Sequence, residues 1–86
     1  MKLTEHFSLE ELTRTSRNAV NVPGIKEKES LKLLAEKVLQ PAREILGRPI
    51  RVSSGYRSVV TNRLVGGAKT SQHIKGEAAD IQCDNN

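Results

Sequence analysis

A histidine and an aspartate, His73 and Asp80, stand seven residues apart near the end of the sequence. Gly76 lies between them and allows the chain to turn sharply, so the two side chains are able to converge. A neutral imidazole and a carboxylate are both good zinc ligands, and a catalytic zinc ion takes three protein ligands and keeps one position open. The spacing alone leaves two interpretations open: a pair of metal ligands, or a loop histidine near a solvated strand aspartate.

Positive charge is concentrated in the segment that contains and precedes His73. Residues 45–76 carry six basic and no acidic side chains, whereas residues 1–44 carry eight basic and seven acidic ones. The basic side chains of the middle segment are Arg48, Arg51, Arg57, Arg63, Lys69 and Lys75. Such a stretch favours an anionic partner through long-range attraction, although a solvated basic face explains the charge equally well.

The elements that must position these residues begin with a short helix. Ser8 and Glu11 have the spacing of a capping box, which predicts a helix that starts after Ser8 and runs to about Thr13. Phe7, just before the cap, is expected to pack on Leu12 and to fix the direction in which the chain enters the helix.

A long amphipathic helix is predicted next, after a surface loop at residues 14–24 that is rich in Ser, Thr and Asn. From Glu27 to Gly47, apolar residues recur at steps of three and four, which indicates one helix with a buried stripe. The stripe consists of Leu31, Leu34, Ala35, Val38, Ala42, Ile45 and Leu46. Pro41 lacks an N–H group and is expected to kink this helix near Val38.

The second half of the sequence predicts two short strands around a helix and a long irregular segment. Residues 50–53 alternate between apolar and polar and indicate a strand, which Gly55 ends. Ser58 caps a predicted helix at residues 59–64, an irregular segment follows to Gly76, and residues 78–82 form the last strand. The two strands are expected to pair, so the fold class is α+β and mostly helical.

Composition excludes several classes of protein. With 86 residues, of which 36% are hydrophobic, the chain builds one small domain. Phe7 and Tyr56 are its only aromatic residues, too few for a platform on which single-stranded nucleic acid stacks. No apolar run approaches the roughly 20 residues of a membrane span, and the first residues lack a secretory signal, so we expect synthesis and retention in the cytoplasm. The single cysteine, Cys83, closes no internal disulfide.

The letters around the histidine and the aspartate resemble a known signature. Residues 71–81 read SQHIKGEAADI, which resembles the S-x-H-x-x-G-x-A-x-D motif of the zinc D-alanyl-D-alanine carboxypeptidases and dipeptidases, the VanY-type murein peptidases related to the hedgehog domain. Upstream, VSSGYRS at 52–58, Asn62 and VGGA at 65–68 are similar to a second block of that family. The opening residues, LTEHFS at 3–8, resemble its phage-like branch. This resemblance implies N-terminal helices beside a small antiparallel sheet, a truncated hedgehog/D-Ala-D-Ala-peptidase fold.

The resemblance also implies a role for individual side chains. His73 and Asp80 correspond to zinc ligands, and Arg57 to the cation that holds the scissile carbonyl or a substrate carboxylate and stabilises the oxyanion. A guanidinium suits that task because it stays charged and binds carboxylates in a bidentate manner. Ser71 either orients His73 or contacts the substrate, or else its hydroxyl only stabilises the loop. Ser54 and Tyr56 are expected to support the turn that carries Arg57, and Asn62 is expected to hold backbone.

In the family, a third zinc ligand, a histidine, and the general base lie downstream of the aspartate strand, and this sequence ends at Asn86. Residues 1–86 are therefore expected to form a single domain that corresponds to the front part of a zinc murein peptidase. We do not expect His6 or Cys83 to replace the third ligand, or Glu77 to act as the base. The strand at residues 78–82 is expected to present an unpaired edge that favours self-association.

The function implied by the resemblance is a zinc metallopeptidase that hydrolyses peptidoglycan stem peptides in the cell wall. It would be a D-Ala-D-Ala carboxypeptidase or an L-Ala-D-Glu endopeptidase of the phage-lysin type. Because the zinc site is incomplete, we expect these 86 residues alone to be inactive. Two alternatives stay open: a non-catalytic fragment that binds cell-wall peptide, and a small basic nucleic-acid-binding domain, which the lack of aromatic residues disfavours. Strongly salt-dependent DNA binding would support the latter.

Overall fold

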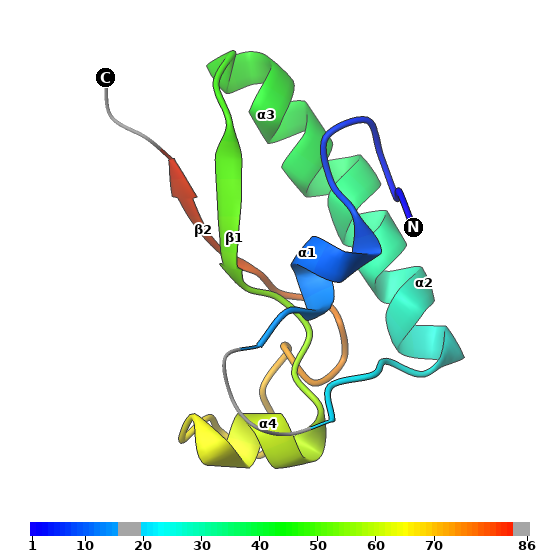
Figure 1. Ribbon diagram of the computed structural model, residues 1–86, viewed down its shortest axis with the longest axis vertical. Helices are drawn as coiled ribbons and strands as arrows, with labels where there is room; N and C mark the ends of the chain where they lie inside the picture. Colours follow the sequence, from blue (N-terminus) through cyan, green and yellow to red (C-terminus); the bar gives the residue numbers. More distant parts are fainter. Residues whose placement is uncertain (16–19, 84–86) are drawn as a thin grey trace.

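The computed structural model of the chain describes residues 1–15 and 20–83. Along the described chain, several helical segments precede a strand, a further helix and a second strand (Figure 1). The elements are α1 (Leu9–Thr13), α2 (Ile25–Leu34), a π-helical turn η1 (Ala35–Leu39), α3 (Gln40–Leu46), β1 (Ile50–Ser54), α4 (Val59–Leu64) and β2 (Asp80–Cys83). The fold is α+β, as predicted, with a two-stranded antiparallel sheet.

Helix α1 begins at a complete capping box. The Glu11 backbone N–H donates to the Ser8 hydroxyl at 3.2 Å, and the Ser8 N–H donates to the Glu11 carboxylate at 3.3 Å. Phe7 and Leu12 are both fully buried, so the apolar contact predicted at this helix entry lies in the core. The predicted bounds of the helix are confirmed. Of the loop predicted after it, residues 16–19 lie outside the described residues, and residues 14–15 and 20–24 form neither helix nor strand.

The long helix begins at Ile25, two residues before the predicted start, and ends at Gly47 as predicted. It is continuous in Figure 1, but its middle contains the π-helical turn η1. There the Gln40 N–H donates to the carbonyl of Ala35, five residues back. Pro41 has no N–H, and in a regular helix its ring crowds the carbonyl of Lys37. The disturbance predicted near Val38 therefore takes the form of a wider turn just before the proline.

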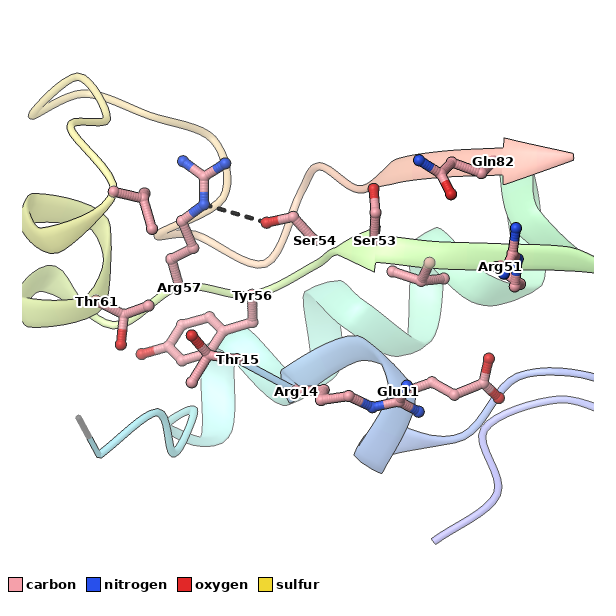
Figure 2. A pocket seen from close by; sticks show the side chains of 12 residues that line it. Glu11, Arg14, Thr15, Arg51, Ser53, Ser54, Tyr56, Arg57, Thr61 and Gln82 are labelled. Carbon is pink, nitrogen blue, oxygen red and sulfur yellow. Dashed lines mark hydrogen bonds between the residues drawn. The ribbon is translucent and has the colours of Figure 1, made fainter. Parts of the chain in front are cut away.

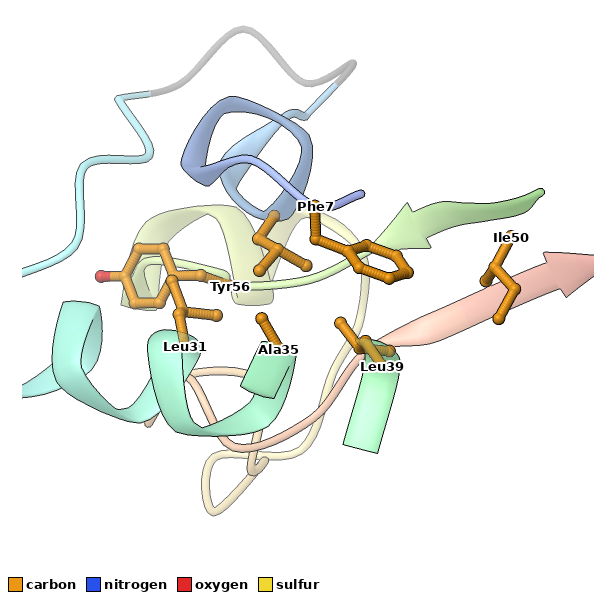
Figure 3. Packing of buried hydrophobic residues seen from close by; sticks show 7 residues of the cluster. Phe7, Leu31, Ala35, Leu39, Ile50 and Tyr56 are labelled. Atoms are coloured by element: carbon orange, nitrogen blue, oxygen red, sulfur yellow. The ribbon is translucent and has the colours of Figure 1, made fainter. Parts of the chain in front are cut away.

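This wider turn changes which side chains of the long helix are buried. The core consists of Phe7, Leu12, Leu31, Ala35, Leu39, Ile50 and Tyr56, drawn in Figure 3. Leu31 and Ala35 are buried as predicted, but the next buried position is Leu39, whereas Val38 is 55% exposed. Ile45 and Leu46 are also exposed. The prediction of one regular buried stripe was thus wrong at Val38, Ile45 and Leu46, whereas Leu34 and Ala42 are half-buried against the core. A π turn holds more residues than an α turn and rotates the side chains that follow it.

Strands β1 and β2 pair with Ile50 opposite Cys83 and Val52 opposite Ile81. The register shifts at Ser53, whose hydroxyl donates to the Asp80 carbonyl at 3.1 Å, and resumes with Ser54 opposite Asp80. The last strand therefore starts at Asp80, not at residue 78 as predicted. Beyond Ser54 the chain leaves the sheet, because Tyr56 donates its N–H to the Leu12 carbonyl of α1.

The outer edge of β2 is where an unpaired sheet edge was predicted. Within the described residues, β2 pairs with β1 along one edge and no further strand covers the other. Self-association through this edge remains a prediction. Helix α4 starts after Ser58, whose hydroxyl accepts the Thr61 N–H, as predicted. Among the described helices, none has the length and apolar character that crossing a bilayer requires.

Candidate functional site

His73 lies in the irregular segment between α4 and β2, and its ring orientation is set by a backbone carbonyl. Its Nδ1 lies 2.7 Å from the carbonyl oxygen of Gly55, at the end of β1. A carbonyl oxygen only accepts hydrogen bonds, so in the neutral ring the proton sits on Nδ1 and the lone pair on Nε2. Histidine ligands of metals are usually oriented in this way. The side chain is 13% exposed. The contact with Gly55 holds the other ring nitrogen, Nε2, in one direction.

Asp80, the first residue of β2, meets this free nitrogen. Asp80 Oδ2 lies 3.6 Å from His73 Nε2. Two donors on a tetrahedral zinc ion, each at roughly 2.0–2.2 Å from the metal, are separated by about 3.3 Å. The two side chains thus lie at nearly the spacing that one ion requires. The Asp80 side chain is 61% exposed, so the pair opens to solvent on its side.

The turn that brings the two together is at Gly76, as predicted from the sequence. Gly76 has a φ of +72°, and a Cβ at this position would lie 2.6 Å from the Glu27 carbonyl oxygen on α2. Only glycine combines this conformation with this approach at no steric cost. The chain therefore turns against the start of α2 and enters β2 with Asp80 beside His73.

Arg57 lies beside the same pair. Its Nη2 is 3.7 Å from Asp80 Oδ2, and its backbone N–H donates to the His73 carbonyl at 3.0 Å. The guanidinium is held by Ser54, which accepts from Nε at 3.2 Å, and by Asn62, which accepts from Nη1 at 3.1 Å. The arginine predicted to act with the histidine and the aspartate is thus positioned by β1 and α4.

Ser71 stabilises the loop that carries His73. Its hydroxyl accepts the His73 backbone N–H at 3.2 Å, and its carbonyl accepts the N–H of Ile74. Two further backbone hydrogen bonds join Gln72 to Lys75 and to Glu77. These contacts fix the backbone under the histidine, so the role of Ser71 that has visible contacts is to stabilise the loop. The ring of His73 itself is oriented by the Gly55 carbonyl.

A pocket of about 610 Å³ adjoins Arg57, between the end of α1, strand β1 and helix α4 (Figure 2). Its charged lining consists of Arg14, Arg51, Arg57 and one carboxylate, Glu11. Ser53, Ser54 and Thr61 add hydroxyl groups. His73 and Asp80 do not line this pocket, so Arg57 is the side chain that joins the cationic pocket to the histidine–aspartate pair.

The similarity of this chain to known proteins shows its family. The model of the peptidase M15 family matches residues 5–86, nearly the whole chain. The chain belongs to the peptidase M15 family. A curated relative, the zinc D-Ala-D-Ala carboxypeptidase of Streptomyces albus G, is 50% identical over 44 residues. That stretch is 50% of this chain and 17% of the relative, so the match spans about a sixth of the relative's length.

The other candidate donors named from the sequence are His6, Glu77 and Cys83. No group of three or more His, Cys, Asp or Glu side chains suited to one ion occurs in the part of the chain that the structure describes. His6 is engaged elsewhere, since its Nδ1 lies 2.8 Å from Gln40 Nε2 on α3. Glu77 lines a separate pocket of about 320 Å³ against α2 and η1. The side chain of Cys83 lies outside the described residues.

Two contacts of the candidate site were not predicted from the sequence. The Gly55 carbonyl that orients His73 has no signal in the sequence, because every residue carries such a carbonyl. Asn62 was expected only to hold backbone, and it does so through its Nδ2, which donates to the Ala68 carbonyl at 2.8 Å. Its second contact, to Arg57, was not predicted. The two residues are only five positions apart, where a turn leads into α4, and this separation permits such a contact.

Proposed function

We propose that this M15 chain carries two zinc ligands, His73 and Asp80, and the substrate-binding arginine, Arg57, of a peptidase that acts on peptidoglycan stem peptides. The observation that supports it most directly is the 3.6 Å separation of His73 Nε2 and Asp80 Oδ2, with Arg57 Nη2 at 3.7 Å from the same oxygen. The donor chemistry fits zinc, since an imidazole nitrogen with a fixed tautomer and a carboxylate are both ordinary zinc ligands. The third donor and the general base come from outside the described residues.

The chemistry divides between the metal and the protein. A bound zinc ion supplies a Lewis acid for the scissile carbonyl. His73, held by the Gly55 carbonyl, keeps its Nε2 directed at the ion's position, and Asp80 provides an anionic donor on the solvent side. Arg57 binds the carbonyl oxygen on which negative charge develops, and a partly buried guanidinium stabilises that charge more than an exposed one does.

The proposed substrate is a cell-wall peptide cut at or next to a D-amino acid. The name of the Streptomyces relative supports a D-Ala-D-Ala carboxypeptidase, and an L-Ala-D-Glu endopeptidase is the alternative within the same class. The cationic pocket beside Arg57 suits a peptide that carries carboxylates, since three arginines and one glutamate line it. The same pocket also supports a second candidate, a non-catalytic domain that binds cell-wall peptide.

Metal binding and peptide binding test the proposal together. In calorimetry, His73→Ala and Asp80→Asn are expected to lower the affinity for zinc at least about tenfold. Matched controls that remove the same chemical groups elsewhere, His6→Ala and Glu77→Gln, are expected to leave it unchanged. Zinc affinity that is unchanged in both His73→Ala and Asp80→Asn would exclude the metal assignment.

For the peptide, we expect a stem peptide ending in D-Ala-D-Ala to shift the NMR signals of Arg57, and its analogue ending in L-Ala-L-Ala to bind less tightly. Arg57→Ala is expected to lose peptide binding and keep zinc binding, while Arg63→Ala, which removes an exposed arginine on α4, keeps both. Peptide binding without zinc binding would favour the non-catalytic candidate. Equal binding of both peptides would contradict a cell-wall substrate.

A further inference from the structure

The guanidinium of Arg57 is fixed on two of its three nitrogens. Nε donates to Ser54 Oγ, the contact drawn as a dashed line in Figure 2, and Nη1 donates to Asn62 Oδ1. The side chain is 17% exposed. Both acceptors are neutral, so they fix the direction of the guanidinium without neutralising its charge. The remaining nitrogen, Nη2, faces Asp80 at 3.7 Å, a distance too long for a hydrogen bond.

Asn62 is itself held in one orientation. It is 3% exposed, and its Nδ2 donates to the Ala68 carbonyl at 2.8 Å. Its backbone carbonyl accepts the N–H of Gly67 at 2.8 Å. If the amide were rotated by half a turn, its NH₂ group would face the guanidinium and its oxygen would face the Ala68 carbonyl, and both contacts would be lost. The acceptor oxygen is therefore directed at Arg57.

Gly67 makes this arrangement possible. A Cβ at residue 67 would lie 2.1 Å from Asn62 Oδ1 and 2.9 Å from Arg57 Nη1. Both distances are shorter than a Cβ atom tolerates, so a side chain here would displace the amide or the guanidinium. The backbone of the loop after α4 thus closes over the contact between Asn62 and Arg57.

We propose that Asn62, together with Ser54, is a positioning residue that directs the Nη2 side of Arg57 toward the space beside His73 and Asp80. The positioning role rests on the proposed function in one respect, namely that the oxygen bound by Nη2 belongs to the substrate. A free arginine side chain has many rotamers and must lose that freedom when it binds a ligand. Asn62 and Ser54 remove most of this rotamer freedom before any ligand binds, so less conformational entropy is lost when a carbonyl oxygen binds to Nη2.

NMR of the Arg57 guanidinium tests the proposal on the chain as it is. In the wild type, rotation about the bonds to Cζ is expected to be slow, with separate signals for Nη1 and Nη2. Asn62→Ala is expected to accelerate this rotation at least tenfold and to merge the signals. Asn62→Asp keeps the acceptor oxygen and is expected to keep the signals separate, although it loses the bond to Ala68. A merely structural asparagine would not show this rescue.

Further variants separate positioning from stability. Ser54→Ala is expected to shift only the Nε signal, and Gly67→Ala to reproduce Asn62→Ala by displacing the amide. Ser8→Ala removes the α1 cap, far from the site in sequence, and is expected to lower stability without changing the Arg57 signals. If Asn62→Ala does not fold, Ser54→Ala and Gly67→Ala decide the matter. Arg57 signals that are unchanged in these variants would overturn the proposal.

Binding provides the functional readout. Asn62→Ala is expected to lower the affinity for the D-Ala-D-Ala peptide about tenfold and to leave the affinity for zinc unchanged. Failure of the positioning role and failure of the proposed function are distinguishable. If the guanidinium responds to Asn62 but neither zinc nor peptide binds, the positioning is correct and the function is wrong. If both ligands bind and the guanidinium ignores Asn62, the function stands and the positioning is wrong.

Discussion

The Nδ1 atom of His73 lies 2.7 Å from the carbonyl oxygen of Gly55, at the point where the chain leaves strand β1. This single contact joins the first strand to the segment that leads into the second. It directs Nε2 toward the Asp80 side chain. Asp80 is itself held beside β1, because its carbonyl accepts a hydrogen bond from the Ser53 hydroxyl, 27 residues earlier in the chain. The candidate metal pair is thus a product of strand pairing and of one backbone carbonyl.

Zinc binding by residues 1–86 is expected to be weak. Two protein donors leave most of the coordination to water, whereas tight sites owe their affinity to a full set of ligands fixed in advance. Added imidazole, which supplies a further nitrogen donor, is expected to raise the affinity. Calorimetry with and without imidazole checks this. Stoichiometric, submicromolar binding by the chain alone would contradict it and direct attention to His6 or Cys83.

Hydrolysis by residues 1–86 alone is expected to be negligible. The loss of a general base by itself lowers a rate by about 10²- to 10⁴-fold, and an incomplete metal site lowers it further. The measurement is the release of D-alanine, or of new amino termini, from purified cell wall with and without zinc. Zinc-dependent turnover would mean that His6, Glu77 or a second copy of the chain completes the site.

Gly76 is expected to be essential both for stability and for the metal pair. Gly76→Ala combines the left-handed conformation with a collision against the Glu27 carbonyl, and we expect a loss of about 3 kcal/mol together with loss of zinc binding. Gly47→Ala is the control, because Gly47 has a similar φ of +65° but open space around it. It should cost about 1–2 kcal/mol and leave zinc binding intact. Urea unfolding and calorimetry measure the two effects, and equal losses in both variants would contradict the collision.

Alkaline pH is expected to destabilise the fold through Tyr56. Burial, and secondarily the negative charge of Glu27, raises the pKa of Tyr56 above its ordinary value of 10.0. Above pH 10 the folded protein therefore keeps a proton that the unfolded chain has lost, so stability is full below this pH and falls as pH rises through the folded-state pKa. Tyr56→Phe should reduce the slope of unfolding free energy against pH in this range. An unchanged slope would contradict the assignment.

Two adjacent residues of η1 test which side of the long helix faces the core. Leu39 is 3% exposed and Val38 is 55% exposed. Leu39→Ala is expected to cost about 2–5 kcal/mol, and Val38→Ala less than about 0.5 kcal/mol. Chemical unfolding gives both values. The opposite order would mean that the helix continues without the π turn.

Much of the local structure was determined by the sequence itself. The caps at Ser8 and Ser58 join atoms within one helical turn, so their spacing predicts where α1 and α4 begin. Gly47 marks the end of the long helix for the same reason. The residues of the site were also recognisable, because His73, Asp80 and Arg57 belong to motifs whose letters and spacings are visible without a structure.

Tertiary structure decided what depends on partners distant in the chain. The burial of Leu39 in place of Val38 follows from how the helix accommodates Pro41 against the core. The start of β2 at Asp80 follows from where β1 leaves the sheet to meet α1. The direction of the Arg57 guanidinium depends on the loop that closes over Asn62. Each is an outcome of packing and hydrogen bonding between separate segments, and such contacts leave no periodic trace in the sequence.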